Sequence, residues 1–148
     1  MNAITRAITA NPTIKPNRIR AALKPIRHLE ADQQALVIEW AHWAYRTQSA
    51  KYPMLRLLHA SMNAAKRSIK QGGRMKAQGM LSGVPDLFLP VPRGDKHGLF
   101  IEMKSEGGRP TRDQLRFIQD VIDLDYAAHI CYSAKEAIAV IEDYYREV

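Results

Sequence analysis

Three charged residues, Asp86, Glu102 and Lys104, stand at positions that the surrounding sequence marks as apolar. Asp86 opens the run PDLFLPV (residues 85–91), and Glu102 and Lys104 lie inside the run FIEMKS (residues 100–105). Each run is typical of a buried β-strand, where an unpaired charge is costly. Charges in such places need a partner, a metal ion or a chemical task.

Strand geometry predicts that these three charges meet. Residues two apart on a strand point to the same side, so Glu102 and Lys104 share a face. If the strand that begins at Asp86 lies alongside, all three groups converge at one edge of the sheet. Two close carboxylates repel each other unless a cation lies between them, and oxygen ligands suit Mg²⁺ or Mn²⁺. A lysine beside such an ion can orient or deprotonate an attacking water, or stabilise charge on a phosphate. The pattern therefore indicates metal-assisted phosphodiester hydrolysis.

A purely structural interpretation competes with this one. Glu102 and Lys104 could form an ion pair on one face of the strand while Asp86 caps a turn, since the tripeptide E-x-K is common. The Pro-Asp pair at the head of the preceding strand favours the metal site.

Helices and strands alternate around these residues. Strands are predicted at Asp86–Val91 and Leu99–Ser105, paired as a hairpin, and at Ala127–Tyr132. An amphipathic helix is predicted over residues 30–47, with both tryptophans in the core; its apolar positions are Leu36, Val37, Trp40, Ala41, Trp43 and Ala44. Residues 54–62 are apolar and suit either a strand or a helix, and residues 66–78 are compatible with a basic helix.

Two capping boxes predict the helices of the second half. Thr111 with Gln114 opens a helix that is expected to bury Leu115, Ile118, Val121 and Ile122. Ser133 with Glu136 opens a terminal helix. The elements together indicate an α/β fold, a small mixed β-sheet flanked by helices.

The 148 residues suit one domain, and their charge is unevenly spread. Residues 1–85 carry 14 lysines and arginines against three acids, whereas residues 86–148 carry eight against 12. Such asymmetry suits a polyanionic partner, although a solvated basic surface is the alternative. No apolar run approaches the ~20 residues of a membrane helix. The single cysteine, Cys131, excludes an intramolecular disulfide and favours the cytoplasm.

Residues 1–28 are expected to form a basic extension. They contain six basic residues and no acid, with three prolines that interrupt a long helix. An import sequence is the alternative interpretation. DNA contacts are expected from Lys15, Arg18 and Arg20 in this extension. Arg109 and Arg112 precede the Gln114 helix and could grip a phosphate at its N-terminus.

Three features in this order resemble the PD-(D/E)xK nuclease superfamily. They are GVPD at residues 83–86, IEMK at residues 101–104 and a helix that bears Gln114. More narrowly, the chain resembles the VRR-NUC family in its small stand-alone form from phages and prophages. The resemblance implies a nuclease-like core and a nuclease domain over residues 29–148. It also implies DNA contacts from Asn63, Lys66, Arg67 and Lys76.

The resemblance further implies a site with roles for individual residues. Asp86 and Glu102 would be the principal ligands of Mg²⁺ or Mn²⁺, with the Met103 backbone carbonyl as a third. Glu30 would reach the metal from the first helix, directly or through water, in preference to Glu39. Lys104 would position the nucleophilic water or meet the scissile phosphate. Gln114 would lie near the active site, unless it serves the capping box.

The function expected from this resemblance is a metal-dependent, structure-selective DNA endonuclease. The specific hypothesis is a homodimer that resembles Holliday-junction resolvases and cuts branched DNA. A flap or nicking nuclease is one alternative, and a basic DNA-binding module without catalysis is the other.

Overall fold

Helix α3 (Glu30–Thr47) begins the part of the chain that the computed structural model describes, residues 30–61 and 77–146. After α3 come the 3-10 turn η1 (Leu55–Leu57) and the strands β1 (His59–Ala60), β2 (Leu87–Leu89) and β3 (Leu99–Met103). Helix α5 (Arg112–Ile122), strand β4 (Ala127–Cys131) and helix α6 (Ala134–Tyr144) complete it. The mixed α/β fold expected from the sequence is confirmed.

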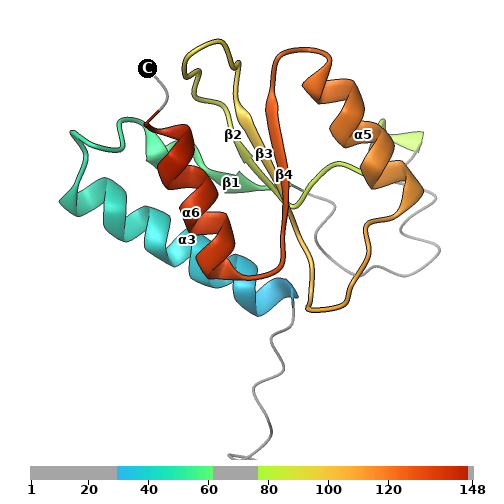
Figure 1. Ribbon diagram of the computed structural model, residues 1–148, viewed down its shortest axis with the longest axis horizontal. Coiled ribbons are helices and arrows are strands. Elements are labelled where there is room, and N and C mark those ends of the chain that lie inside the picture. Colours follow the sequence, from blue (N-terminus) through green and yellow to red (C-terminus); the bar gives the residue numbers. More distant parts are fainter. Residues whose placement is uncertain (1–29, 62–76, 147–148) are drawn as a thin grey trace, which may run out of the picture.

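The four strands form one sheet in the order β1-β2-β3-β4. Strands β1, β2 and β3 pair antiparallel, so the predicted hairpin of β2 and β3 is confirmed. Strand β4 pairs parallel with β3, because the chain crosses over through α5 before it returns to the sheet. Helices α3 and α6 cover one face of the sheet and α5 lies on the other (Figure 1).

The face towards α3 and α6 holds the main apolar core. Alternate residues of β3, Leu99, Ile101 and Met103, are fully buried there. They pack in one cluster with Val37 of α3 and Ile141 of α6. This alternation leaves the remaining β3 side chains, Phe100 and Glu102, on the face towards α5.

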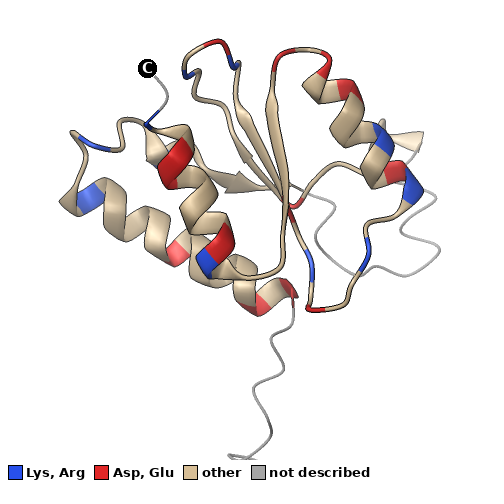
Figure 2. Ribbon diagram, viewed as in Figure 1, with Lys and Arg blue, Asp and Glu red and all other residues tan. Residues whose placement is uncertain are grey.

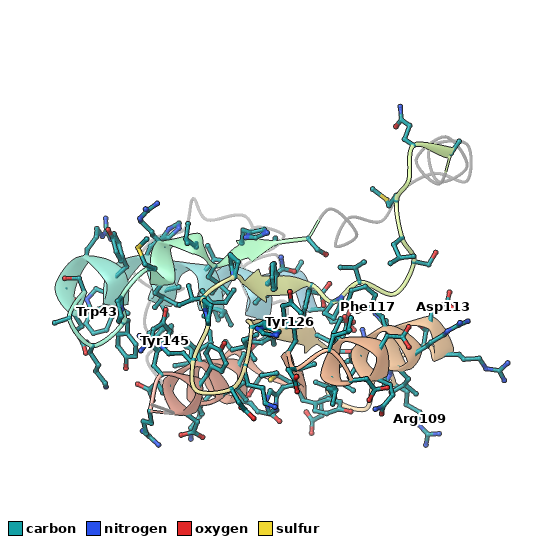
Figure 3. All side chains as sticks on the ribbon, turned by 90° about the horizontal axis from the view of Figure 1, so that it is seen from above. Trp43, Arg109, Asp113, Phe117, Tyr126 and Tyr145 are labelled. Atoms are coloured by element: carbon teal, nitrogen blue, oxygen red, sulfur yellow. The ribbon has the colours of Figure 1, made fainter. Side chains whose placement is uncertain are left out.

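The face towards α5 carries a cluster of aromatic rings. Phe100 stacks on Phe88 of β2 with ring centroids 4.3 Å apart. It also meets Phe117 of α5 and Tyr126 at 5.5 Å each. Figure 3 shows Phe117 on α5, beside the strands. Strand β3 is therefore buried on both faces, and Glu102 is carried into the interior with it.

Several predictions of which helix residues are buried are wrong. In α3 the residues towards the core are Gln33, Val37, Ala41 and Ala44, so Leu36 and Trp43 are about half exposed. Trp40 is only partly buried against the core.

Val121 is the buried residue of helix α5, while Leu115 and Ile122 are exposed and Ile118 is partly buried. In both helices the apolar arc is wider than the strip that touches the sheet, because one neighbouring layer covers only one side of a helix.

The predicted boundaries shift by a few residues. Strand β2 is three residues long because Pro90 and Pro92 cannot donate to a sheet. The ambiguous stretch from residue 54 supplies both a short 3-10 turn and the two-residue strand β1. The basic extension 1–28 and most of the basic segment 66–78 lie outside the described residues.

No helix in the described ranges is long and apolar enough to cross a membrane.

Candidate active site

Asp86 and Glu102 face each other across the β2–β3 hairpin. Leu87 pairs with Ile101, and continuing this register by one residue sets Asp86 opposite Glu102. Oδ2 of Asp86 accepts a hydrogen bond of 2.9 Å from the backbone N–H of Met103. The side chain thus bridges the two strands, rather than capping a turn as the structural alternative predicted.

The carboxylate of Glu102 is fully buried and its two oxygens differ. Oε1 accepts hydrogen bonds from Lys104 Nζ at 2.5 Å and from Gln114 Nε2. Oε2 receives no hydrogen bond from the described part of the chain. The ion pair of the structural alternative does form, but it occupies only one oxygen. A buried oxygen without a donor is costly, which is unexpected for a group with a purely structural role.

Lys104 holds the strand end as well as the carboxylate. The residue is 7% exposed, and its ammonium group also donates to the Met103 carbonyl at 3.2 Å. Its backbone N–H bonds to the Cys131 carbonyl of β4, continuing the parallel ladder past Met103.

Glu30 reaches the same region from the first turn of α3. Its Oε1 accepts a hydrogen bond of 3.2 Å from the backbone N–H of Ser105, just beyond β3. Figure 2 shows the acidic start of α3 beside the segment that follows β3. The negative charge of Glu30 contributes to raising the pKa of Asp86 and of Glu102. Glu39, by contrast, is exposed further along the helix.

Gln114 serves the capping box and contacts Glu102 at the same time. Its Oε1 accepts from the Thr111 backbone N–H at 2.8 Å, and the Thr111 hydroxyl accepts from the Gln114 N–H, which completes the capping box of α5. Its Nε2 donates to Glu102. One amide therefore joins the start of α5 to the buried carboxylate.

The carboxyl groups of Asp86 and Glu102 have raised pKa values and so bind protons more tightly than usual. Burial raises the pKa of Glu102 to about 7; Lys104 opposes this rise and the Asp86 carboxylate adds to it. Burial also raises the pKa of Asp86, while the hydrogen bond from the Met103 N–H and the charge of Lys104 oppose the rise.

The pKa of Lys104 reflects a balance of opposite effects. Burial alone would lower it, but the hydrogen bond to Glu102 and the negative charge of Glu102, Glu30 and Asp86 raise it. Lys104 therefore stays a cation through the neutral range, and the site holds a fixed positive charge beside two acids.

A divalent cation fits the chemistry of these donors. Asp86 and Glu102 lie opposite each other, and Oε2 of Glu102 is buried without a hydrogen-bond partner in the described part of the chain. A cation between two such carboxylates would relieve their repulsion. Residues 30–61 and 77–146 hold no group of three or more His, Cys, Asp or Glu side chains arranged for a metal. Asp86, Glu102 and the Met103 carbonyl would therefore need water in the other positions, as is usual for Mg²⁺.

Only two of the residues that were expected to contact DNA lie in the described part of the chain. Arg109 and Arg112 are exposed where the chain enters α5, and Figure 3 shows Arg109 on the outer side of the molecule. The remaining expected contacts lie outside the described residues: Lys15, Arg18, Arg20, Asn63, Lys66, Arg67 and Lys76.

Gly83 is a residue of the site region to which the sequence analysis gave no role. Its φ is +82°, and a Cβ there would lie 2.4 Å from the Asp113 carbonyl oxygen in the first turn of α5. The sequence offered one signal for such a role, a glycine three residues before the candidate metal ligand Asp86. The close approach itself depends on packing between distant segments.

Comparison with known proteins identifies the family of this chain. The family model for the VRR-NUC domain matches residues 15–135. The chain belongs to the VRR-NUC family. A solved structure named as a VRR_NUC domain protein superposes with a TM-score of 0.67 at 26% identity, over 84% of this chain and 93% of the other. No curated protein matches the chain.

The VRR-NUC assignment supports a nuclease-type function with DNA as the substrate. Nuclease domains of this kind generally use divalent metal ions. Asp86, directly before β2, and Glu102 of β3 are the acids that the sequence analysis expected to bind such an ion.

The pKa values predict an unusual pH dependence of stability. Glu102 binds its proton more tightly in the folded than in the unfolded state, so its contribution to stability is fully present below about pH 4.5 and is lost as the pH rises through about 7. We expect the melting temperature of the chelator-treated protein to fall by several degrees between pH 6 and pH 8. Mn²⁺ competes with the proton, so its stabilising effect should grow over the same range.

Scanning calorimetry at both pH values, with EDTA and with Mn²⁺, checks this prediction. Glu102→Gln cannot ionise and should flatten the profile. A melting temperature that rises from pH 6 to pH 8 in EDTA would contradict the assignment of the buried acid.

Proposed function

We propose that this protein is a metal-dependent, structure-selective DNA endonuclease that acts as a homodimer on branched DNA, in the manner of a Holliday-junction resolvase. One observation carries the proposal. The fully buried Glu102 has one oxygen held by Lys104 and Gln114, and the other left without a donor from the described residues, beside Asp86.

The residues of the site would divide the work of phosphodiester hydrolysis. Asp86 and Glu102 would hold Mg²⁺ or Mn²⁺, together with the Met103 carbonyl and with Glu30 directly or through water. The ion would supply Lewis-acid stabilisation of the charge that develops on the phosphate. Lys104 keeps Glu102 in place and presents a permanent positive charge to the attacking water or the scissile phosphate. Gln114 holds Glu102 from the other side.

DNA would approach the end of the sheet at which β3 ends, near Met103. Arg109 and Arg112 are exposed beside that end and suit phosphates that flank the cut. Basic residues of the first half of the chain, among them Lys66 and Arg67, would extend the contact. Two sites related by a twofold axis would match the twofold-related cut positions of a four-way junction.

The test is incubation of the purified protein with end-labelled DNA and Mg²⁺, Mn²⁺ or chelator. We expect paired, symmetric nicks in a four-way junction, and no cutting in chelator. Cleavage confined to flaps or nicked duplex would identify a flap or nicking nuclease. Salt-sensitive binding without cleavage in any metal would identify a non-catalytic binding module. Light scattering at assay concentration tests the dimer.

The basic extension is expected to contribute to DNA affinity. Replacing Lys15, Arg18 and Arg20 with alanine should weaken junction binding. It should also reduce the slope of log Kd against log salt by about 0.9 for each phosphate that the variant no longer neutralises. Fluorescence anisotropy at several salt concentrations in EDTA measures both quantities.

A matched control removes the same charge from another surface. Arg46, Lys51 and Arg56 are exposed at and beyond the other end of α3, and Arg46 lies about 24 Å along the helix from Glu30 at ~1.5 Å per residue. Their triple alanine variant should bind the junction more tightly than the extension variant. Equal affinity and slope in the two variants would remove the extension from the DNA-binding surface.

A further inference from the structure

Backbone contact joins the segment before Asp86 to the first turn of α5. A Cβ at Gly83 would lie 2.4 Å from the carbonyl oxygen of Asp113, 2.5 Å from its carbonyl carbon and 2.9 Å from the Gln114 nitrogen. Real side chains do not approach backbone atoms this closely, so only glycine allows the two segments to touch. Two other described glycines of positive φ have open surroundings instead: Gly79, at φ +90°, and Gly107, at φ +77°.

The same turn of α5 contacts the site a second time through Gln114. The Thr111 N–H is a donor and the Glu102 carboxylate is an acceptor, so a single orientation of the Gln114 amide satisfies both. The capping box holds the amide in that orientation. The start of α5 is thus locked to the Asp86 segment by packing and to Glu102 by a hydrogen bond.

We propose that the first turn of α5 is the positioning element of the acidic pair, with Gly83 and Gln114 as its two positioning residues. Gly83 sets how closely the segment that leads to Asp86 approaches α5. Gln114 and Lys104 together occupy Oε1 of Glu102, which orients the carboxylate and leaves Oε2 for the metal ion. The inference rests on the proposed metal-dependent function and names what sets the geometry of its metal site.

This arrangement predicts that loss of either positioning contact, at Gly83 or at Gln114, weakens metal binding itself. Partners that orient a metal ligand typically change metal affinity or activity by 10–100-fold when they are removed. A merely structural role would lower stability and leave the affinity of the folded protein for Mn²⁺ unchanged. Calorimetric titration of DNA-free protein with Mn²⁺ therefore separates the two roles.

The first variant is Gly83→Ala, with Gly79→Ala as its control. Both place alanine at a similar positive φ, but only the first meets backbone atoms. Gly83→Ala should raise the Kd for Mn²⁺ about tenfold or more and slow junction cleavage by about 10–100-fold. Gly79→Ala should stay within about threefold of the parent in both measurements. Junction affinity in EDTA should be similar in all three proteins.

The second variant is Gln114→Met, with Thr111→Ala as its control. Both remove a hydrogen bond of the capping box, and only the methionine also removes the donor to Glu102. Gln114→Met should weaken Mn²⁺ binding as strongly as Gly83→Ala. Thr111→Ala should lower the melting temperature while the Kd for Mn²⁺ stays within about threefold of the parent.

The outcomes are distinct. An unchanged Kd for Mn²⁺ in folded Gln114→Met overturns the inference, and this variant decides the matter if Gly83→Ala does not fold. Equal weakening in Thr111→Ala and Gln114→Met also overturns it, because loss of the cap alone would then explain the effect. A parent protein that binds Mn²⁺ and cuts no DNA refutes the proposed nuclease, while the Mn²⁺ titrations still test the positioning roles.

Discussion

Cleavage of a four-way junction is expected to fall by about 10³-fold or more when Glu102 becomes glutamine, the loss seen when an enzyme is deprived of a main transition-state stabiliser. Glutamine keeps the shape of the side chain and can still accept from Lys104. It cannot bring a negative charge to a divalent ion. Asp86→Ala and Glu102→Ala should be equally inactive, because each removes one of the two carboxylates that face each other across the hairpin.

Junction affinity in chelator should stay close to that of the parent, since the buried Glu102 presents almost no surface to DNA. Glu39→Gln is the matched control, an exposed acid on the same helix as Glu30. It should retain parental activity, and Glu30→Gln should lose part of it. Cleavage by rigorously purified Glu102→Gln protein at the parental rate would refute the assignment of the site.

Replacing Lys104 with methionine should produce two losses that depend differently on pH. Cleavage should fall by about 10²-fold or more at every pH, because the fixed positive charge at the phosphate is gone. Stability should fall as well, since removing one partner of a buried ion pair typically costs about 3–5 kcal/mol. Glu102 can relieve this cost by keeping a proton, so the loss should be smaller at pH 6 than at pH 8.

Urea unfolding at both pH values measures the stability, and a double variant separates the two effects. Lys104→Met combined with Glu102→Gln leaves no buried charge unpaired at this position, so stability at pH 8 should largely return while cleavage stays absent. Lys135→Met, at an exposed position in the first turn of α6, controls for the loss of one lysine. If the single Lys104 variant were as stable at pH 8 as the parent, the buried pair would carry no net interaction.

Local sequence rules were reliable where the structure depends on neighbours along the chain. The period of two along β3 separates Glu102 from Ile101 and Met103, and this follows from strand geometry alone. The capping box of α5 is likewise a contact between residues three apart. For the same reason the facing of Asp86 and Glu102 follows from the hairpin once its two strands are recognised.

Burial on the helices was less predictable, because it depends on which neighbour covers each side. Trp43 and Leu115 are large and apolar, yet about half of each side chain is exposed. The sequence pattern counts apolar residues around a helix. Only the packed fold decides how much of that arc the sheet touches.

The sequence by itself determined that two acids and a lysine lie in or directly beside adjacent strands, because alternation and turn chemistry are encoded within a few residues of each position. It also determined the fold class. Only the tertiary structure decided which oxygen of Glu102 is occupied, that Gln114 caps a helix and holds a carboxylate at once, and that Gly83 touches α5. Those contacts join segments distant in the chain, and their distances are set by how the layers pack against one another.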